Sequence, residues 1–161
     1  MWRSAAVSLV VLLTIHSVWG QVPKFENYAV GRVYNGRNAR PVITKDDRVF
    51  RTRIRWAAAN EKRDFAGEYI LAQFGCGAEC LYTFALNART GGVAWLLFSI
   101  CCWRPMDLVT PTESRLRSRL LVLRGLRSEG RGQFSGDART DTHYYELRNG
   151  KFRHLRTVKQ P

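Results

Sequence analysis

The chain lacks the short motifs that mark most recognisable enzymes. It has no Gly-x-Ser-x-Gly nucleophile elbow, no Walker-type phosphate loop, no His-Glu-x-x-His zinc motif and no Rossmann fingerprint. Beyond residue 20 it has only two histidines, His143 and His154, and ordinary surface or core positions are favoured for them over a two-histidine metal site. These absences favour a non-catalytic protein over an enzyme, and they leave no catalytic residue, metal or cofactor to assign.

Acidic residues are scarce beside basic ones. The chain has 26 Lys and Arg against 13 Asp and Glu, a formal net charge of +13. No run of five or six consecutive basic residues forms a separate basic arm. The excess is mostly arginine, which contacts phosphates and carboxylates in a bidentate manner. The charge indicates anionic partners such as phospholipid, lipopolysaccharide, nucleic acid or acidic glycan, or else a surface that is charged for solubility.

No hydrophobic run is long enough for a transmembrane helix. The mostly apolar residues 5–15 would extend about 16 Å as a helix, well short of the ~30 Å hydrocarbon core. Arg3 precedes this run, and Val18 and Gly20 follow it at the −3 and −1 positions of a cut before Gln21. This pattern predicts that residues 1–20 are a signal peptide, cleaved near Gly20–Gln21, and that the protein is secreted or periplasmic. Export also disfavours a genomic nucleic-acid partner.

The exported part has the length of one domain. Residues 21–43 are polar, broken by proline and glycine, and predict an irregular N-terminal arm with at most one short strand near residues 28–34. Residues 44–161 predict a single helix-plus-antiparallel-sheet domain.

A helix is expected from about Asp47 to Lys62, with Thr44 or Asp46 as its N-cap. One face of this helix carries apolar residues at helical spacing: Phe50, Ile54, Ala57 and Ala58. The other side carries a basic stripe, which is the best candidate for a contact with an anion or a partner: Arg48, Arg51 and Arg55.

The rest of the chain has the alternating pattern of strands. Strands are expected over residues 68–74, 81–87, 93–100 and 116–123, and the Gly-, Ser- and Arg-rich segment 125–140 is expected to be mobile. Asn149-Gly150 predicts a type I′ hairpin that pairs Leu147 with Phe152, Tyr145 with His154 and Glu146 with Arg153. The predicted fold class is α+β, with one N-terminal helix packed on an antiparallel β-meander of five to six strands.

The four cysteines suit an exported protein with disulfides. Counting from the turn of the central hairpin places position 80 opposite about 99, so all four thiols should gather at one end of this hairpin. We favour one bridge from each of Cys101 and Cys102 to Cys76 and Cys80, because a vicinal Cys101–Cys102 bridge closes a strained ring. A local Cys76–Cys80 bridge with a vicinal pair is the main competitor.

Two other chemistries compete for these cysteines. A zinc site usually has two Cys-x2–4-Cys knuckles, and adjacent Cys101 and Cys102 do not form one. A redox site favours Cys-x-x-Cys at a helix N-terminus, whereas Cys76 and Cys80 have three residues between them in a loop between strands.

The segment 64–80 resembles a family of small exported bacterial proteins. The residues that carry the resemblance are Asp-Phe-Ala-Gly-Glu-Tyr-Ile-Leu at 64–71, Gly-Cys-Gly-Ala-Glu-Cys at 75–80, Thr-Gly-Gly-Val at 90–93 and Cys-Cys-Trp at 101–103. This chain departs from the family pattern with Asp64 in place of Asn and Asn87 in place of Asp. The resemblance implies a bacterial envelope or secreted location, and it supplies no catalytic residue.

The sequence therefore predicts an exported, disulfide-stabilised, non-catalytic basic domain that binds an anionic envelope component or a protein partner. The alternatives are a small secreted enzyme or thiol-redox or metal protein centred on the Cys76–Cys80 loop, and an inhibitor of a secreted hydrolase.

Overall fold

The computed structural model describes residues 21–77, 80–103, 110–130, 133–134 and 141–159. The expected signal peptide, residues 1–20, lies outside the described residues, so its cleavage stays a prediction. Within the described ranges, no helix combines the length and the apolar character needed to cross a membrane.

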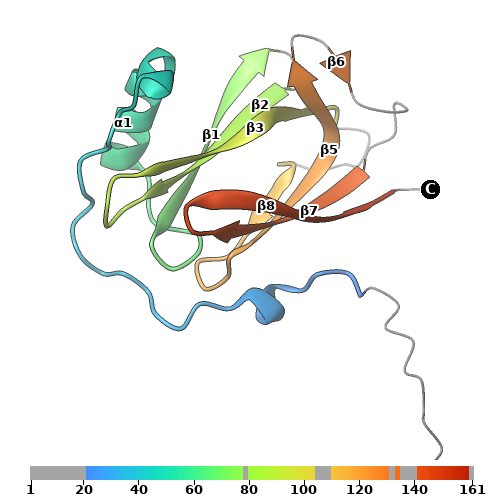
Figure 1. The fold of residues 1–161 in the computed structure, drawn as a ribbon, viewed down its shortest axis with the longest axis horizontal. Helices are drawn as coiled ribbons and strands as arrows, with labels where there is room; N and C mark the ends of the chain where they lie inside the picture. Colours follow the sequence, from blue (N-terminus) through green and yellow to red (C-terminus); the bar gives the residue numbers. More distant parts are fainter. Residues whose placement is uncertain (1–20, 78–79, 104–109, 131–132, 135–140, 160–161) are drawn as a thin grey trace, which may run out of the picture.

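An irregular arm leads into the regular elements and runs along one side of the molecule (Figure 1). Backbone hydrogen bonds hold the arm at several points, including Val30 N to Arg117 O and Ala39 N to Ala88 O. Where a short strand was expected, Ala29 makes a single bridge to Ser118. The helical elements are η1 (Phe25–Tyr28), η2 (Asp46–Phe50) and α1 (Arg51–Asn60), and the strands are β1 (Tyr69–Gly77), β2 (Cys80–Asn87), β3 (Val93–Cys101), β4 (Thr112–Ser114), β5 (Leu120–Gly130), β6 (Gln133–Phe134), β7 (Asp141–Arg148) and β8 (Lys151–Val158).

All strand pairs are antiparallel, in the order β1-β2-β3-β5-β7-β8, and β4 and β6 both pair with β5. The structure is thus mostly an antiparallel sheet with one short helix, as the coarse fold class predicted. The finer prediction was wrong in two respects. The sheet has more than five to six strands, because the short strands β4 and β6 add to those expected, and β6 lies in the segment 125–140 that was expected to be mobile. The helix is not N-terminal, because the arm and η1 precede it.

Strand β5 joins two halves of the sheet. Its first part, up to Gly125, pairs with β4 and β7, and its second part, from Leu126, pairs with β3 and β6. Gly125 has φ +135°, and a Cβ at this position would collide with the carbonyl oxygen of Cys101. The glycine therefore permits the strand to pass from one half to the other, and the segment after it is a strand through residue 130.

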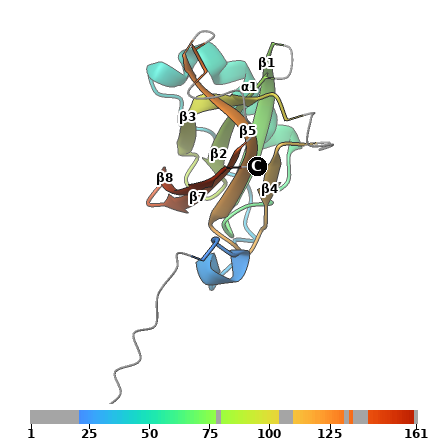
Figure 2. The same cartoon turned by 90° about the vertical axis from the view of Figure 1, so that its right-hand side faces the viewer.

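The apolar residues form three layers of core. Alternate residues of β1 point to opposite sides of the sheet, so that Ile70 and Ala72 face α1 while Leu71 faces the centre of the molecule. The central cluster joins β1, β2 and β3 to β5 and β7, and a third cluster packs Phe25 of η1 on the outer face of β5 (Figures 1 and 2). The order across the molecule is helix, half-sheet, central core, half-sheet and arm.

The closing hairpin has the predicted register. Leu147 pairs with Phe152, Glu146 with Arg153 and Tyr145 with His154, and Asn149 and Gly150 both have positive φ, as a type I′ turn requires. Tyr145 and Leu147 are buried in the central cluster, so this side of the hairpin faces inward.

The central hairpin departs from the predicted register by two residues. Phe84 pairs with Trp95 as the turn dictates, but Tyr82 pairs with Ser99, so three residues of β3 lie opposite Thr83. This bulge brings Cys80 opposite Cys101 rather than residue 99.

Candidate functional site

The cysteines gather at one end of the central hairpin, but their pairing differs from the favoured prediction. Cys76 is bonded to Cys80 across the β1–β2 connection, with their Cα atoms 5.1 Å apart. Cys101 lies opposite Cys80 on β3, and its Sγ is 2.8 Å from Sγ of Cys102. The predicted bridges from Cys101 and Cys102 to the other pair were therefore wrong, and the structure has the local Cys76–Cys80 bridge of the competing arrangement.

This arrangement bears on the metal and redox alternatives. Cys76 and Cys80 supply no thiolate to a metal while they are bonded to each other. Among the described residues, no group of three or more histidine, cysteine, aspartate or glutamate side chains is placed to hold a metal ion.

The two histidines share the hydroxyl of one threonine. Nδ1 of His143 and Nε2 of His154 each lie 2.9 Å from Oγ1 of Thr157. Nε2 of His143 lies 3.1 Å from the carbonyl oxygen of Gly125, which can only accept, so Nε2 carries the proton and Nδ1 accepts from Thr157. His143 is buried and thus ties β7 to the bend of β5 and to β8.

A pH dependence of stability follows from this buried imidazole. Burial lowers the pKa of His143 below its ordinary value of 6.5, and the charge of Arg127 acts in the same direction. The folded protein then binds fewer protons than the unfolded chain, so this stabilisation is complete above pH 6.5 and is lost as pH falls through the lowered pKa. We expect the free energy of unfolding in urea to decrease between about pH 8 and about pH 5.

The same measurement on two variants isolates the group responsible. His143→Gln should remove most of the decrease in that range, whereas His154→Gln should leave it, because His154 is exposed. An equal pH profile for the wild type and His143→Gln would contradict the assignment.

The predicted basic stripe lies on an exposed helical surface. Arg48 is the third residue of η2, and Arg51 and Arg55 belong to α1. All three side chains are exposed, and none forms an ion pair with a carboxylate of the described residues. Arg51 donates from Nη1 to the carbonyl oxygen of Arg48, and this hydrogen bond links the side chain of Arg51 to η2.

Sequence reasoning missed two apolar residues on this surface. Val49 is 83% exposed and Trp56 is 57% exposed, and their separation of seven residues places them on the same side of the helix. Both residues lie outside the helix face that packs on the sheet. Apolar residues outside that face of the helical pattern were the signal by which the sequence could have revealed them. We call the set of Arg48, Val49, Arg51, Arg55 and Trp56 the helix surface.

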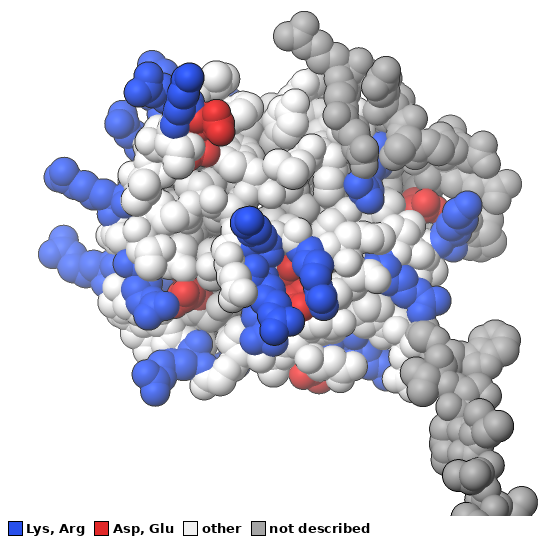
Figure 3. All heavy atoms as spheres, in the orientation of Figure 1, with Lys and Arg blue, Asp and Glu red and all other residues white. Residues whose placement is uncertain are grey.

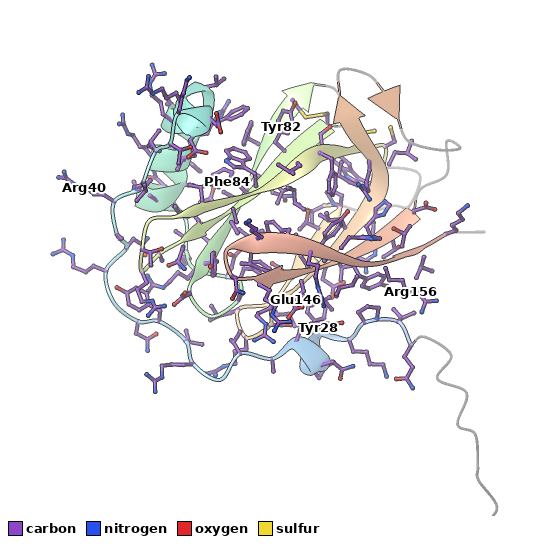
Figure 4. All side chains as sticks on the ribbon, viewed as in Figure 1. Tyr28, Arg40, Tyr82, Phe84, Glu146 and Arg156 are labelled. Carbon is purple, nitrogen blue, oxygen red and sulfur yellow. A yellow bond between two sulfur atoms is a disulfide. The ribbon has the colours of Figure 1, made fainter. Side chains whose placement is uncertain are left out.

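Basic side chains gather on this edge of the molecule. Figure 3 shows lysine and arginine over α1 and along the neighbouring arm at the left. Arg40 projects outward from the arm beside α1 in Figure 4. Asp46 is an exposed acid at the start of η2, whereas Asp47 is buried. The helix surface therefore keeps an excess of positive charge.

Asp47 anchors this surface to the sheet. Its Oδ1 accepts from Nε1 of Trp95 at 2.8 Å, and its Oδ2 accepts from the backbone N and the hydroxyl of Thr44. Burial by itself would raise the pKa of Asp47, but the hydrogen bonds from Thr44 and Trp95 outweigh it and the pKa is lowered. The carboxylate thus stays charged and joins the start of the helical segment to β3.

Aromatic packing completes the anchor. The ring of Phe50 lies 4.9 Å from that of Trp95 and 5.2 Å from that of Phe74. Phe50, Ile54, Ala57 and Ala58 all pack against the sheet, as their spacing predicted. The basic face therefore points to solvent because the opposite face is held.

Comparisons with family models, with curated proteins and with solved structures found no match. The resemblance to small exported bacterial proteins stays a prediction.

Proposed function

We propose that the protein is an exported, non-catalytic domain that binds an anionic envelope component through the helix surface. The observation that supports this most is the exposure of Arg48, Arg51 and Arg55, without carboxylate partners in the described part of the chain, beside the exposed Trp56. Exposed arginine and tryptophan on one side of a helix suit a phosphate- or carboxylate-bearing surface with an apolar layer beneath it.

The overall positive charge of the chain also favours binding to an anionic envelope component. A chain of net charge +13 is attracted to an anionic surface before any specific contact forms. Each arginine near such a surface contributes about 1 kcal/mol of attraction, and salt weakens the part that is exposed. The rigid attachment of α1 to the sheet means that binding does not require this surface to be ordered first.

The exported location rests on residues 1–20 and on the cysteines. A Cys76–Cys80 disulfide is compatible with an oxidising compartment. The alternative of a thiol-redox or metal protein at this loop requires a reactive thiolate, which neither cysteine has while the bond is intact.

The experiment compares binding to vesicles. The variant Arg48→Glu/Arg51→Glu/Arg55→Glu should bind vesicles of phosphatidylglycerol at least about 100-fold more weakly than the wild type, because about 3 kcal/mol of attraction is lost. Co-sedimentation at low salt measures the binding, and the wild type should bind neutral phosphatidylcholine vesicles weakly.

A charge-matched variant is the control. Arg32→Glu/Arg117→Glu/Lys159→Glu changes the net charge by the same amount at exposed positions outside the helix surface. It should lose far less affinity than the first variant. Equal losses would show that only net charge matters and would refute the helix surface as the site, and unchanged binding by the first variant would refute the proposed function.

A further inference from the structure

The sheet is open along one side, between β3 and β8. Residues 93–95 of β3 pair with β2, but the pairing of β3 with β5 begins only at Ser99, and β8 pairs with β7 alone. The two strand edges border a groove of about 590 Å³ that reaches the central cluster. β8 crosses the molecule beside β3 at this side (Figure 1). The groove lies within the range of about 300–1,000 Å³ that is typical of small-ligand sites.

The floor and the rim of this groove differ in chemistry. The floor is apolar and consists of core-facing residues, including Leu96, Phe98 and Phe152. The ionisable cations among the described lining residues are Arg127, Lys151 and His154, and no aspartate or glutamate is among them. Arg127 lies with its guanidinium carbon 4.5 Å from the ring centroid of Phe98.

Leu97 is an unusually exposed residue of this groove. It lines the groove and is 90% exposed, the most exposed large apolar side chain of the described residues. Leu97 points to the opposite side of β3 from Leu96 and Phe98, which face the core. Leu97 therefore stands at the open rim of the groove and not on its floor.

We propose that this groove binds a fatty acid, with its alkyl chain along Leu96, Phe98 and Phe152 and its carboxylate beside Lys151 and His154. The apolar floor selects the chain, and the basic rim residues Lys151 and His154, with no acid among the described lining residues, select the negative head group by charge complementarity. The site is separate from the helix surface and does not depend on it.

An added peptide strand fits the groove less well. The β3 edge is interrupted by the bulge opposite Thr83, and β8 has a second irregularity, where Tyr145 pairs with His154 but Tyr144 pairs with Arg156. Bulges of this kind disrupt the regular row of backbone groups that strand addition needs. An alkyl chain needs no such row.

The test uses quenching of Trp95, which lines the groove. In a background with the other tryptophans (Trp2, Trp19, Trp56 and Trp103) changed to phenylalanine, dodecanoate brominated on its chain should quench tryptophan fluorescence with saturation, at concentrations below micelle formation. Unlabelled dodecanoate should displace it, dodecanol should displace it at least about tenfold less well, and each methylene removed from the fatty acid should weaken binding by roughly three- to fourfold.

Two exposed substitutions test the location without disturbing the core. Leu97→Glu/Lys151→Glu should weaken dodecanoate binding by about tenfold or more, and the variant with Arg48, Arg51 and Arg55 changed to glutamate should bind dodecanoate as the wild type does. The reverse pattern is expected for vesicles, so the two proposals fail independently. Absence of saturable quenching, equal competition by dodecanol, unchanged binding by Leu97→Glu/Lys151→Glu, or binding of an acidic extended peptide in place of dodecanoate would each overturn the proposal.

Discussion

Replacement of Phe84 by alanine is expected to lower the free energy of unfolding by about 3–5 kcal/mol. The side chain is 1% exposed and packs between α1 and the sheet, where Figure 4 shows it on the strands facing the helix. Its ring centroid lies 5.0 Å from that of Trp95 and 6.3 Å from that of Phe74. Truncation removes the buried ring and leaves a cavity that Ile54 of α1 cannot fill without moving.

Urea unfolding followed by circular dichroism measures this loss. Trp56→Ala is the matched control, because it removes an aromatic ring from the exposed side of α1, the helix against which Phe84 packs. It should change stability by about 0.5 kcal/mol or less. A loss of under about 1 kcal/mol for Phe84→Ala would show that the packing of α1 on the sheet does not depend on this ring. The same variant should also weaken vesicle binding, since the helix surface is displayed on the element that Phe84 supports.

Gly125→Val is expected to destabilise the protein by at least about 3 kcal/mol and to reduce the yield of folded material. The backbone at this position has φ +135°, a conformation that side chains bearing a Cβ rarely adopt. The added Cβ would also meet the carbonyl oxygen of Cys101 and the side chain of Ile100. Because β5 passes between the two half-sheets at this residue, relief of the clash requires the halves to separate.

Gly31→Val is the control for this substitution. Gly31 lies in the arm, has no atom within 4 Å of the position of an added Cβ, and does not have the positive φ of Gly125. It should unfold within about 0.5 kcal/mol of the wild type. Comparable stability of Gly125→Val and Gly31→Val would mean that the bend of β5 tolerates a side chain, contrary to the geometry described above.

The predictions that succeeded concern neighbours along the chain. The register of the closing hairpin follows from Asn149-Gly150, because a two-residue turn leaves one pairing for the residues on either side. The inner face of the helix follows from the 3.6-residue period, which acts within a few turns. The exposure of Arg48, Arg51 and Arg55 follows from the same period, since a helix that buries one face leaves the other in solvent.

The predictions that failed concern strands that are distant along the chain. The bulge of β3 moves Cys101 opposite Cys80. The geometry of the turn does not predict this bulge, because the bulge depends on how β3 pairs with both β2 and β5. The same holds for β4 and β6, which form because the long β5 offers them an edge. The Cys76–Cys80 bridge is local, and the prediction failed because it favoured bridges to the more distant Cys101 and Cys102.

The burial of the ion-paired Glu146 also depends on a distant segment. Its carboxylate lies on the side of the closing hairpin away from Tyr145 and Leu147, yet it is 6% exposed and contacts both Arg119 and Arg153. Burial depends on which residues pack over a side chain. For Glu146 these include Arg119, which lies in a distant part of the chain.

Helical period and turn geometry were thus readable from the order of residues, because each depends on atoms a few positions apart, and net charge follows from composition alone. The bend at Gly125 and the groove between β3 and β8 depend on contacts between segments far apart in the chain, and such contacts exist only once the two half-sheets have packed together.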